Sequence, residues 1–176
     1  MRNRLTSFAL VMAVTPLLAG CGFRPLYSGG TAGVVAQQIG SVDVAAIEGK
    51  GGWLVRNALN DRLSAISGGN GPHYRLVVKL DDQIIGVGVR PDDAVTRERR
   101  TLRARYQLFD QATGAVVLDA TAGSDAGIDV ASSEYATIAS EDTALERLAQ
   151  IVADQIITRM AQKIASESAA APAKGQ

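Results

Sequence analysis

Residues 99–130 read RRTLRARYQLFDQATGAVVLDATAGSDAGIDV, and this stretch decides the fold. Apolar and polar side chains alternate on both sides of a short turn at residues 110–114, with the period of two that is typical of β-strands. The apolar face carries Leu102, Ala104, Tyr106 and Leu108 before the turn, and Val116, Leu118, Ala120, Ala122, Ala126, Ile128 and Val130 after it. A short turn containing glycine joins antiparallel strands. The stretch therefore predicts a hairpin with one apolar, buried face (the dry face) and one polar, solvent-exposed face (the wet face).

Two more strands and a helix are predicted upstream of this hairpin. Residues 41–47 form a short β-branched run, and residues 74–80 alternate like the hairpin strands, with an extension over residues 84–89 left open. Residues 90–93 are a predicted turn. Glycines at 49–52 are expected to end the first strand, and residues 53–66 then carry Val55, Leu59, Leu63 and Ile66 at helical spacing. Gly68 and Gly69 are expected to end that helix.

A long amphipathic helix completes the predicted fold. Its apolar positions are Leu145, Leu148, Val152, Ile156, Met160 and Ile164. Ser140, Glu141 and Asp142 suit its start, and Arg159 and Lys163 suit its end, because these charges complement the helix dipole. Two helices can cover only one face of a four-stranded sheet. The predicted class is α+β: a two-layer sandwich with both helices on one face of a mainly antiparallel sheet, in the order β-α-β-β-β-α.

Composition excludes several function classes. The 176 residues suit one domain, and 18 basic against 18 acidic residues argue against a generally basic nucleic-acid binder. A single Cys and a single His can form neither an internal disulfide nor a Cys/His zinc site. Nucleophile-elbow, zinc-protease and phosphate-loop motifs are missing from the sequence. His73, at the start of a strand, is interpreted as a bystander, so we expect no enzyme, cofactor or metal.

The N-terminus has the pattern of a bacterial lipoprotein signal. Arg2 and Arg4 precede an apolar run over residues 8–19 that is shorter than the roughly 20 residues needed to cross a bilayer. Residues 18–21 read LAGC, which resembles the lipobox whose cysteine is acylated before cleavage. Two or more acyl chains anchor a protein stably. Gly22 in place of an aspartate favours the outer membrane, with the domain on its periplasmic side.

The chain then divides into four parts. We predict a signal peptide over residues 1–20, a lipidated linker at 21–38 that begins with Cys21, a folded domain at 39–166 and a disordered tail at 167–176.

Five arginines within nine positions are the most unusual feature of the sequence: Arg97, Arg99, Arg100, Arg103 and Arg105. Strand alternation places all of them except Arg100 on the wet face, where Arg75 and Lys79 of the preceding strand are expected to join them. Guanidinium groups fit the oxygens of phosphates and carboxylates. These six cations are therefore the candidate site for an anionic ligand.

A structural ladder of ion pairs is the alternative interpretation of the same residues. If Phe109 lies opposite Ala115, Arg105 faces Asp119 and Arg99 faces Asp125, while Arg103 faces Thr121 and has no acid. A slip of two residues would instead place Arg105 opposite Thr121. The sequence leaves both registers open, with Arg103 the stronger candidate for an external ligand.

Several motifs, taken in order, resemble a known family. They are the opening CGFRPLY at residues 21–27, Arg56-Asn-x-Leu59, the strand at 74–80, the hairpin at 106–119 with Thr113-Gly114, Glu134-Tyr135-Ala136, and Ala153-Asp154-x-Ile156 with Arg159. Together they are similar to the lipopolysaccharide (LPS) assembly lipoproteins of the LptE family, in the form found in alphaproteobacteria. The resemblance covers most of residues 21–164.

This resemblance implies an outer-membrane lipoprotein that plugs a β-barrel partner, LptD, and binds LPS through basic residues. On that basis the candidate LPS-binding residues are Arg103, Arg105, Arg99, Arg97, Arg75 and Lys79. Two other functions stay open at this point. One is an auxiliary lipoprotein of a lipid-transporting ABC system, and the other is a periplasmic hydrolase that works through scattered carboxylates in a deep pocket.

Overall fold

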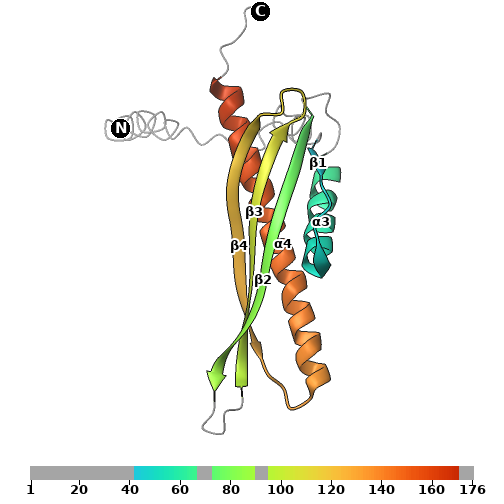
Figure 1. Ribbon diagram of the computed structural model, residues 1–176, viewed down its shortest axis with the longest axis vertical. Coiled ribbons are helices and arrows are strands. Elements are labelled where there is room, and N and C mark those ends of the chain that lie inside the picture. Colours follow the sequence, from blue (N-terminus) through green and yellow to red (C-terminus); the bar gives the residue numbers. More distant parts are fainter. Residues whose placement is uncertain (1–41, 67–72, 90–94, 171–176) are drawn as a thin grey trace, which may run out of the picture.

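The computed structural model describes residues 42–66, 73–89 and 95–170, which contain six elements (Figure 1). In chain order they are β1 (Val42–Val44), α3 (Gly49–Ser64), β2 (Tyr74–Val89), β3 (Val95–Asp110), β4 (Val116–Asp129) and α4 (Glu134–Ala170). This is the predicted order β-α-β-β-β-α. The predicted signal peptide and linker, Cys21, Gly68, Gly69 and the turn at 90–93 lie outside the described residues.

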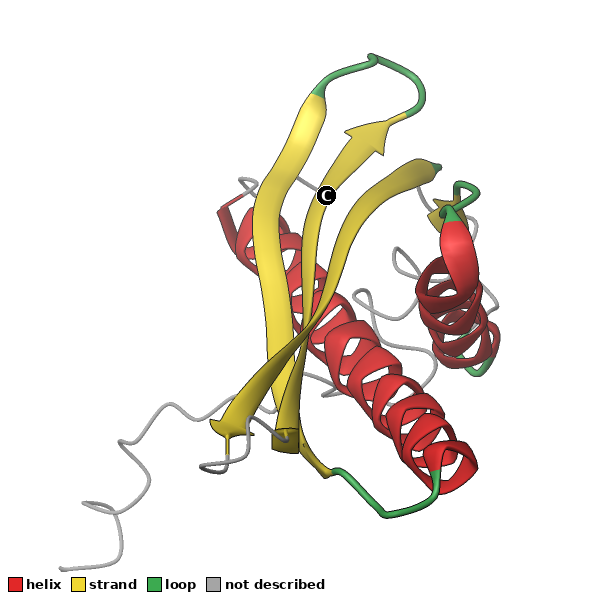
Figure 2. Ribbon diagram, turned by 60° about the horizontal axis from the view of Figure 1, so that its bottom comes forward, coloured by secondary structure: helices red, strands yellow, loops and turns green. Residues whose placement is uncertain are grey.

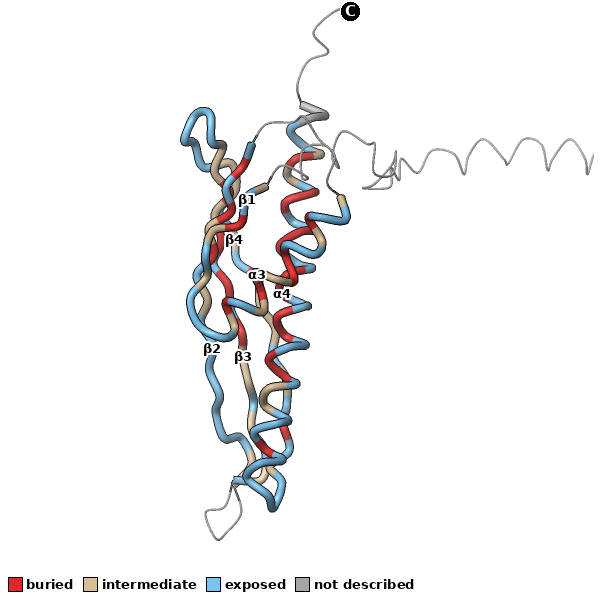
Figure 3. Tube along the Cα trace, turned by 90° about the vertical axis from the view of Figure 1, so that its right-hand side faces the viewer, coloured by how far each residue is buried: buried red, intermediate tan, exposed pale blue. Residues whose placement is uncertain are grey.

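The four strands form one sheet in the order β1-β2-β3-β4. The short strand β1 pairs parallel with β2, while β2 with β3 and β3 with β4 pair antiparallel. Both helices lie on the same side of the sheet, and the other side is uncovered by any described element (Figure 3). The predicted two-layer α+β sandwich is therefore confirmed.

One hydrophobic core fills the space between the sheet and the helices. Long α4 crosses the sheet diagonally (Figure 2). Its inward residues, Leu145, Leu148, Val152, Ile156, Met160 and Ile164, are those that the helical spacing predicted. They pack against Leu76, Leu102, Tyr106 and Leu108 of the sheet and against Val55 and Leu59 of α3. The buried residues of β3 alternate strictly, as the hairpin pattern predicted.

The prediction that residues 49–52 precede the first helix is wrong, because α3 begins at Gly49. Gly49 has a positive φ of 78°, which lets the chain turn sharply from β1 into the helix. Gly52 lies so close to the segment before the helix that a Cβ there would be 2.6 Å from the carbonyl oxygen of Ile47. These glycines permit a tight entry into α3 and do not interrupt it.

The last helix is longer than its apolar spacing predicted. It begins at Glu134, six residues before Ser140, and runs to Ala170, four residues into the stretch expected as a tail. The early start escapes the pattern because Tyr135 and Ile138 are 82% and 49% exposed, so this turn buries little apolar surface. Buried Thr137 holds it instead, since its hydroxyl accepts the Ala131 N–H at 3.1 Å and donates to the Ser133 carbonyl at 3.4 Å.

The molecule has two distinct ends. The start of β1, the turn between β3 and β4 and the end of α4 lie at one end, and the β2–β3 hairpin end and the start of α4 lie at the other (Figure 1). Exposed apolar side chains gather at that hairpin end: Ile84, Ile85, Val87 and Val95. Strand β2 is continuous through residues 81–83 and includes the extension that the sequence left open.

Candidate functional site

The candidate site is the uncovered side of the sheet, which we call the open face. All six predicted cations lie on it: Arg75 and Lys79 on β2, and Arg97, Arg99, Arg103 and Arg105 on β3. Each is exposed, and its even-numbered neighbours point toward the helices. Five acids share this face, namely Asp43, Asp81, Asp119, Asp125 and Asp129. The face is therefore charged in both signs and not uniformly basic.

The observed register between β3 and β4 is the second of the two predicted ones, in which the pairing is shifted by two residues. Arg105 lies opposite Thr121, Arg103 opposite Gly123 and Arg99 opposite Gly127. The register with Phe109 opposite Ala115 is wrong, because the turn is one residue wider and an irregularity follows it between Leu108 and Phe109. Asp110 closes the turn, where its N–H donates to the Ala115 carbonyl at 3.0 Å and its carboxylate accepts the Ala112 N–H at 2.7 Å.

Two of the arginines are held by acids despite the shifted register. Arg105 reaches diagonally to Asp119, with Nη2 3.0 Å and Nε 3.3 Å from its two carboxylate oxygens. The Gln107 amide donates to the same carboxylate at 2.9 Å. These hydrogen bonds lower the pKa of Asp119. Arg97 lies directly opposite Asp129, and its Nε donates a hydrogen bond to the Asp129 carboxylate at 2.9 Å.

The other open-face cations are held loosely or not at all. Arg103 comes within 3.9 Å of Asp125, too far for a hydrogen bond. Arg99 faces Gly127, and Asp125 comes near Arg103 instead, so the pairing of Arg99 with Asp125 that one register predicted is wrong. Within the described part of the chain, the side chains of Arg75, Lys79 and Arg99 form no hydrogen bond or ion pair. These charges are free to meet an external anion.

A shallow basin of about 620 Å³ lies at the centre of the open face. Lys79, Arg103 and Arg105 line it together with one acid, Asp81, which lies directly opposite Arg103. Gly123 is its floor: a Cβ there would lie 2.6 Å from Cδ of Arg103, so the arginine side chain lies flat over the glycine. The basin therefore presents three cations around a small patch of bare strand backbone.

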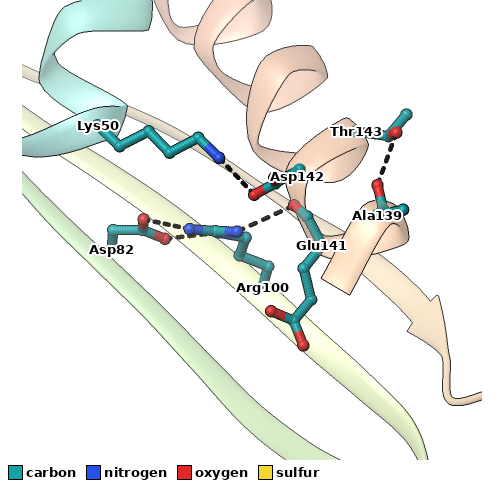
Figure 4. A network of polar contacts seen from close by, with 7 residues as sticks. All are labelled: Lys50, Asp82, Arg100, Ala139, Glu141, Asp142 and Thr143. Atoms are coloured by element: carbon teal, nitrogen blue, oxygen red, sulfur yellow. Dashed lines mark hydrogen bonds and ion pairs between the residues drawn. The ribbon is translucent and has the colours of Figure 1, made fainter. Parts of the chain in front are cut away.

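Arg100 has a different role from its neighbours, because it points toward the helices (Figure 4). Its guanidinium donates to both carboxylate oxygens of Asp82, at 2.9 and 2.6 Å, and to the Glu141 carbonyl at 2.9 Å. The hydrogen bond with Asp82 raises the pKa of Arg100. Beside it, Lys50 of α3 contacts Asp142 of α4 at 2.6 Å. Arg100 therefore joins β2, β3 and the first turns of α4.

Strand alternation did not indicate one feature beside the basin. Gln155 of α4 accepts the Gly123 N–H at 2.9 Å and donates to its carbonyl at 3.3 Å, so it covers one position on the outer edge of β4. This contact joins a helix to a strand edge, and no periodicity in either element indicates it. His73 is exposed at the start of β2.

Among residues 42–66, 73–89 and 95–170, no cluster of three His, Cys, Asp or Glu side chains could hold a metal ion. Within the same residues, neither helix is long and apolar enough to span a membrane.

The fold and the open face define a class: a small two-layer α+β domain whose charged sheet face is available for binding. The particular family follows from comparison with known proteins. The family model LptE, described as lipopolysaccharide-assembly, matches residues 39–160. The chain belongs to this family of LPS-assembly lipoproteins.

Solved structures agree with this assignment. A protein described as a lipoprotein from Caulobacter crescentus is 30% identical, with a TM-score of 0.63 over 77% of this chain and 98% of that one. Rare lipoprotein B from Shewanella oneidensis shares the fold at 12% identity, with a TM-score of 0.50 over 74% of this chain and 96% of that one. No curated protein matches the sequence.

Proposed function

We propose that this protein is a non-enzymatic, outer-membrane lipoprotein, anchored on the periplasmic side through Cys21, that assists an LptD-like β-barrel and binds LPS during its assembly. The observation that carries the proposal is the open face. It is uncovered along three long strands, and it presents cations that no described acid neutralises.

The chemistry of these cations suits LPS. Its lipid A part bears phosphates or uronic acids above acyl chains, and guanidinium and ammonium groups bind such anions through charge-assisted hydrogen bonds. Arg99, Lys79 and Arg103 are the residues that we assign to this contact. Arg97 and Arg105 are less available, because each already holds an aspartate.

The mixed charge of the open face also suits a position inside a large barrel. The interior of outer-membrane barrels is polar. A sheet face on which aspartates and arginines alternate can contact such a wall without burying unpaired apolar or charged groups. The barrel contact is therefore proposed to use the same side of the sheet that carries the free cations.

Titration with purified LPS tests the ligand. The double variant Lys79→Gln/Arg99→Gln should bind LPS about thirtyfold more weakly, since each of the two lost charge-assisted contacts is worth on the order of 1 kcal/mol. The matched control, Arg147→Gln/Lys163→Gln, removes the same charge from α4 and should bind normally. Equal losses in both variants would show that only net charge matters and would overturn the assignment.

Gentle solubilisation of membranes tests the partner. Tagged full-length protein should co-purify with a barrel of much larger mass. Recovery of the tagged protein alone from membranes that contain an LptD-like barrel would contradict the proposal. Separating membranes by density distinguishes it from an ABC-system auxiliary protein, which would have a partner in the inner membrane.

A further inference from the structure

A second groove, of about 630 Å³, lies on the helix side of the molecule between edge strand β4 and α4. Its lining includes Tyr106, Thr121, Gln155, Thr158, Arg159 and Gln162. It adjoins the open-face basin at Thr121 and Gln155 but contains none of the six open-face cations. A volume of this size is in the ordinary range of small-molecule sites.

Most polar side chains of this groove make no polar contact with the described residues. Within the described residues, the side chains of Thr121, Thr158, Arg159 and Gln162 form no hydrogen bond or ion pair. Thr158 differs in this from Thr143 of the same helix, whose hydroxyl donates to the Ala139 carbonyl at 2.9 Å. The groove thus offers two hydroxyls, an amide and a guanidinium that the protein itself does not use.

The other two polar groups of the groove are held in place by the protein. Asp154 contacts Arg62 of α3 at 2.5 Å, which draws its negative charge toward that helix. Gln155 is fixed by its two hydrogen bonds to the Gly123 backbone. Arg159 therefore supplies the free charge of the groove, and that charge is positive.

Tyr106 forms the inner wall of the groove. It is only 1% exposed, and its side chain forms no hydrogen bond with the described residues. Its hydroxyl is nevertheless not a buried unpaired group, because Glu98 Oε2 is the one such side-chain atom among the described residues. Burial raises the pKa of Tyr106, and the positive charge of nearby Arg159 partly offsets this rise. The phenol and the guanidinium therefore lie near each other at the base of the groove.

The edge of β4 adds backbone groups to the same wall. Gly123 points its N–H and its carbonyl away from β3, where Gln155 binds both. In an antiparallel ladder every second residue has this orientation, so Thr121 also directs its N–H and carbonyl outward. These groups supply one more donor and one more acceptor beside the hydroxyl of Thr121.

We propose that this groove binds a sugar that carries a carboxylate or a phosphate. The Arg159 guanidinium would bind the anionic group. The ring hydroxyls would be bound by the Gln162 amide and by the hydroxyls of Thr121, Thr158 and Tyr106. The inference needs neither the barrel nor the acyl anchor. The acidic sugar could come from a glycolipid head group or from a free glycan, and the experiment separates these sources.

Amide chemical shifts of the ¹⁵N-labelled full-length protein in non-ionic detergent provide the test. Glucuronate and glucose 6-phosphate should each shift the signals of Thr121, Thr158 and Gln162 saturably, while glucose and inorganic phosphate should bind at least several-fold more weakly. Competition by LPS micelles would identify a glycolipid head group as the source. Absence of competition would identify a free glycan.

Four variants complete the experiment. Arg159→Gln should weaken glucuronate binding about tenfold. Arg147→Gln, which removes an exposed arginine three helical turns away, should leave it unchanged. Tyr106→Phe should weaken it several-fold. The open-face double variant Lys79→Gln/Arg99→Gln should bind glucuronate normally, so this result is independent of the LPS titration.

The proposal fails if no saturable shift occurs at the groove. It also fails if Arg159→Gln and Arg147→Gln behave alike, or if inorganic phosphate binds as tightly as glucose 6-phosphate, because the sugar would then contribute nothing.

Discussion

Arg99 and Arg105 lie on the same strand, face the same way and are both exposed, yet only Arg105 is held by an acid. The difference comes from the neighbouring strand. Asp119 lies diagonally across from Arg105 and contacts its guanidinium, whereas Asp125, in the equivalent diagonal position beside Arg99, comes within 3.9 Å of Arg103 instead. At the scale of the residue, the role of an arginine is therefore decided by which of the neighbouring arginines the nearest aspartate contacts.

The pair of Arg105 and Asp119 predicts a measurable titration. In the Arg105→Gln variant the pKa of Asp119 should rise toward its ordinary value, because the strongest hydrogen bond to its carboxylate is lost. NMR titration of the side-chain carboxyl carbon measures it. Arg103→Gln is the control and should leave Asp119 unchanged.

The same pair predicts the sign of a pH effect. Because the folded-state pKa of Asp119 is lowered, its contribution to stability is complete above a pH of about 4 and is lost as the pH falls through the folded-state value. The stability difference between wild type and Arg105→Gln should therefore shrink on acidification. A difference that grows below pH 4 would contradict the pairing.

Neighbouring glycines at the start of α3 should respond in opposite directions to alanine. Gly52→Ala would force a Cβ to 2.6 Å from the Ile47 carbonyl oxygen, and it should lower the free energy of unfolding by about 1–3 kcal/mol. Gly51→Ala meets nothing closer than 3.5 Å, and it should raise this free energy by about 0.4–1 kcal/mol. Denaturant unfolding measures both. Equal effects would show that the close approach is unimportant.

At the scale of the element, the sequence predicted what each strand buries but not how the strands align. The dry faces of β3 and β4 follow from alternation alone, and every predicted cation lies on the wet face. Register depends on the conformation of the turn, and one extra residue there together with the irregularity between Leu108 and Phe109 moved the partner of Arg105 from Asp119 to Thr121. Ion pairs that depend on register were therefore predicted only as alternatives.

Contacts between different kinds of element were the least predictable part of the candidate site. Arg100 belongs to the arginine cluster by position, but its partners are Asp82 on another strand and a helix carbonyl at Glu141. The groove between β4 and α4 was missed for the same reason. Its residues come from two elements whose relative placement has no sequence signature.

Arg100 should matter for stability, whereas Arg99 should not. The Arg100 side chain is 11% exposed, so Arg100→Gln leaves Asp82 half-buried without its partner and should lower the free energy of unfolding by about 1–3 kcal/mol. Arg99→Gln, one residue away on the open face, should change it by less than about 0.5 kcal/mol. Thermal melts of the two variants provide the comparison. Similar losses would contradict the separate roles of the two faces.

At the scale of the whole molecule, the order of the elements and the family were both predicted from sequence. The order followed from alternating and helical patterns, and the family from short motifs in the correct succession. The lengths of α3 and α4 were underestimated, because glycines and exposed side chains in a first helical turn do not look helical. Attachment to a membrane remains a prediction, since Cys21 lies outside the described residues.

Cys21→Ser tests that attachment directly. The variant should lack acyl chains and should appear in the soluble fraction, while its thermal melt stays that of the wild type because position 21 precedes the folded domain. Mass spectrometry of the mature N-terminus and fractionation of the envelope measure the two outcomes. An unmodified thiol on the wild-type mature chain, or release of that chain by salt alone, would contradict acyl anchoring.

Because the molecule has two distinct ends, the length of strands β2 and β3 has a further consequence. The chain enters the domain at β1, and the exposed apolar residues of the β2–β3 hairpin lie at the far end (Figure 1). Each of these strands has 16 residues, which corresponds to roughly 50 Å. If acyl chains anchor the chain ahead of β1, the length of the hairpin sets how far its apolar end can reach beyond the start of the domain. Removing two residues from each strand would shorten that reach by roughly 7 Å.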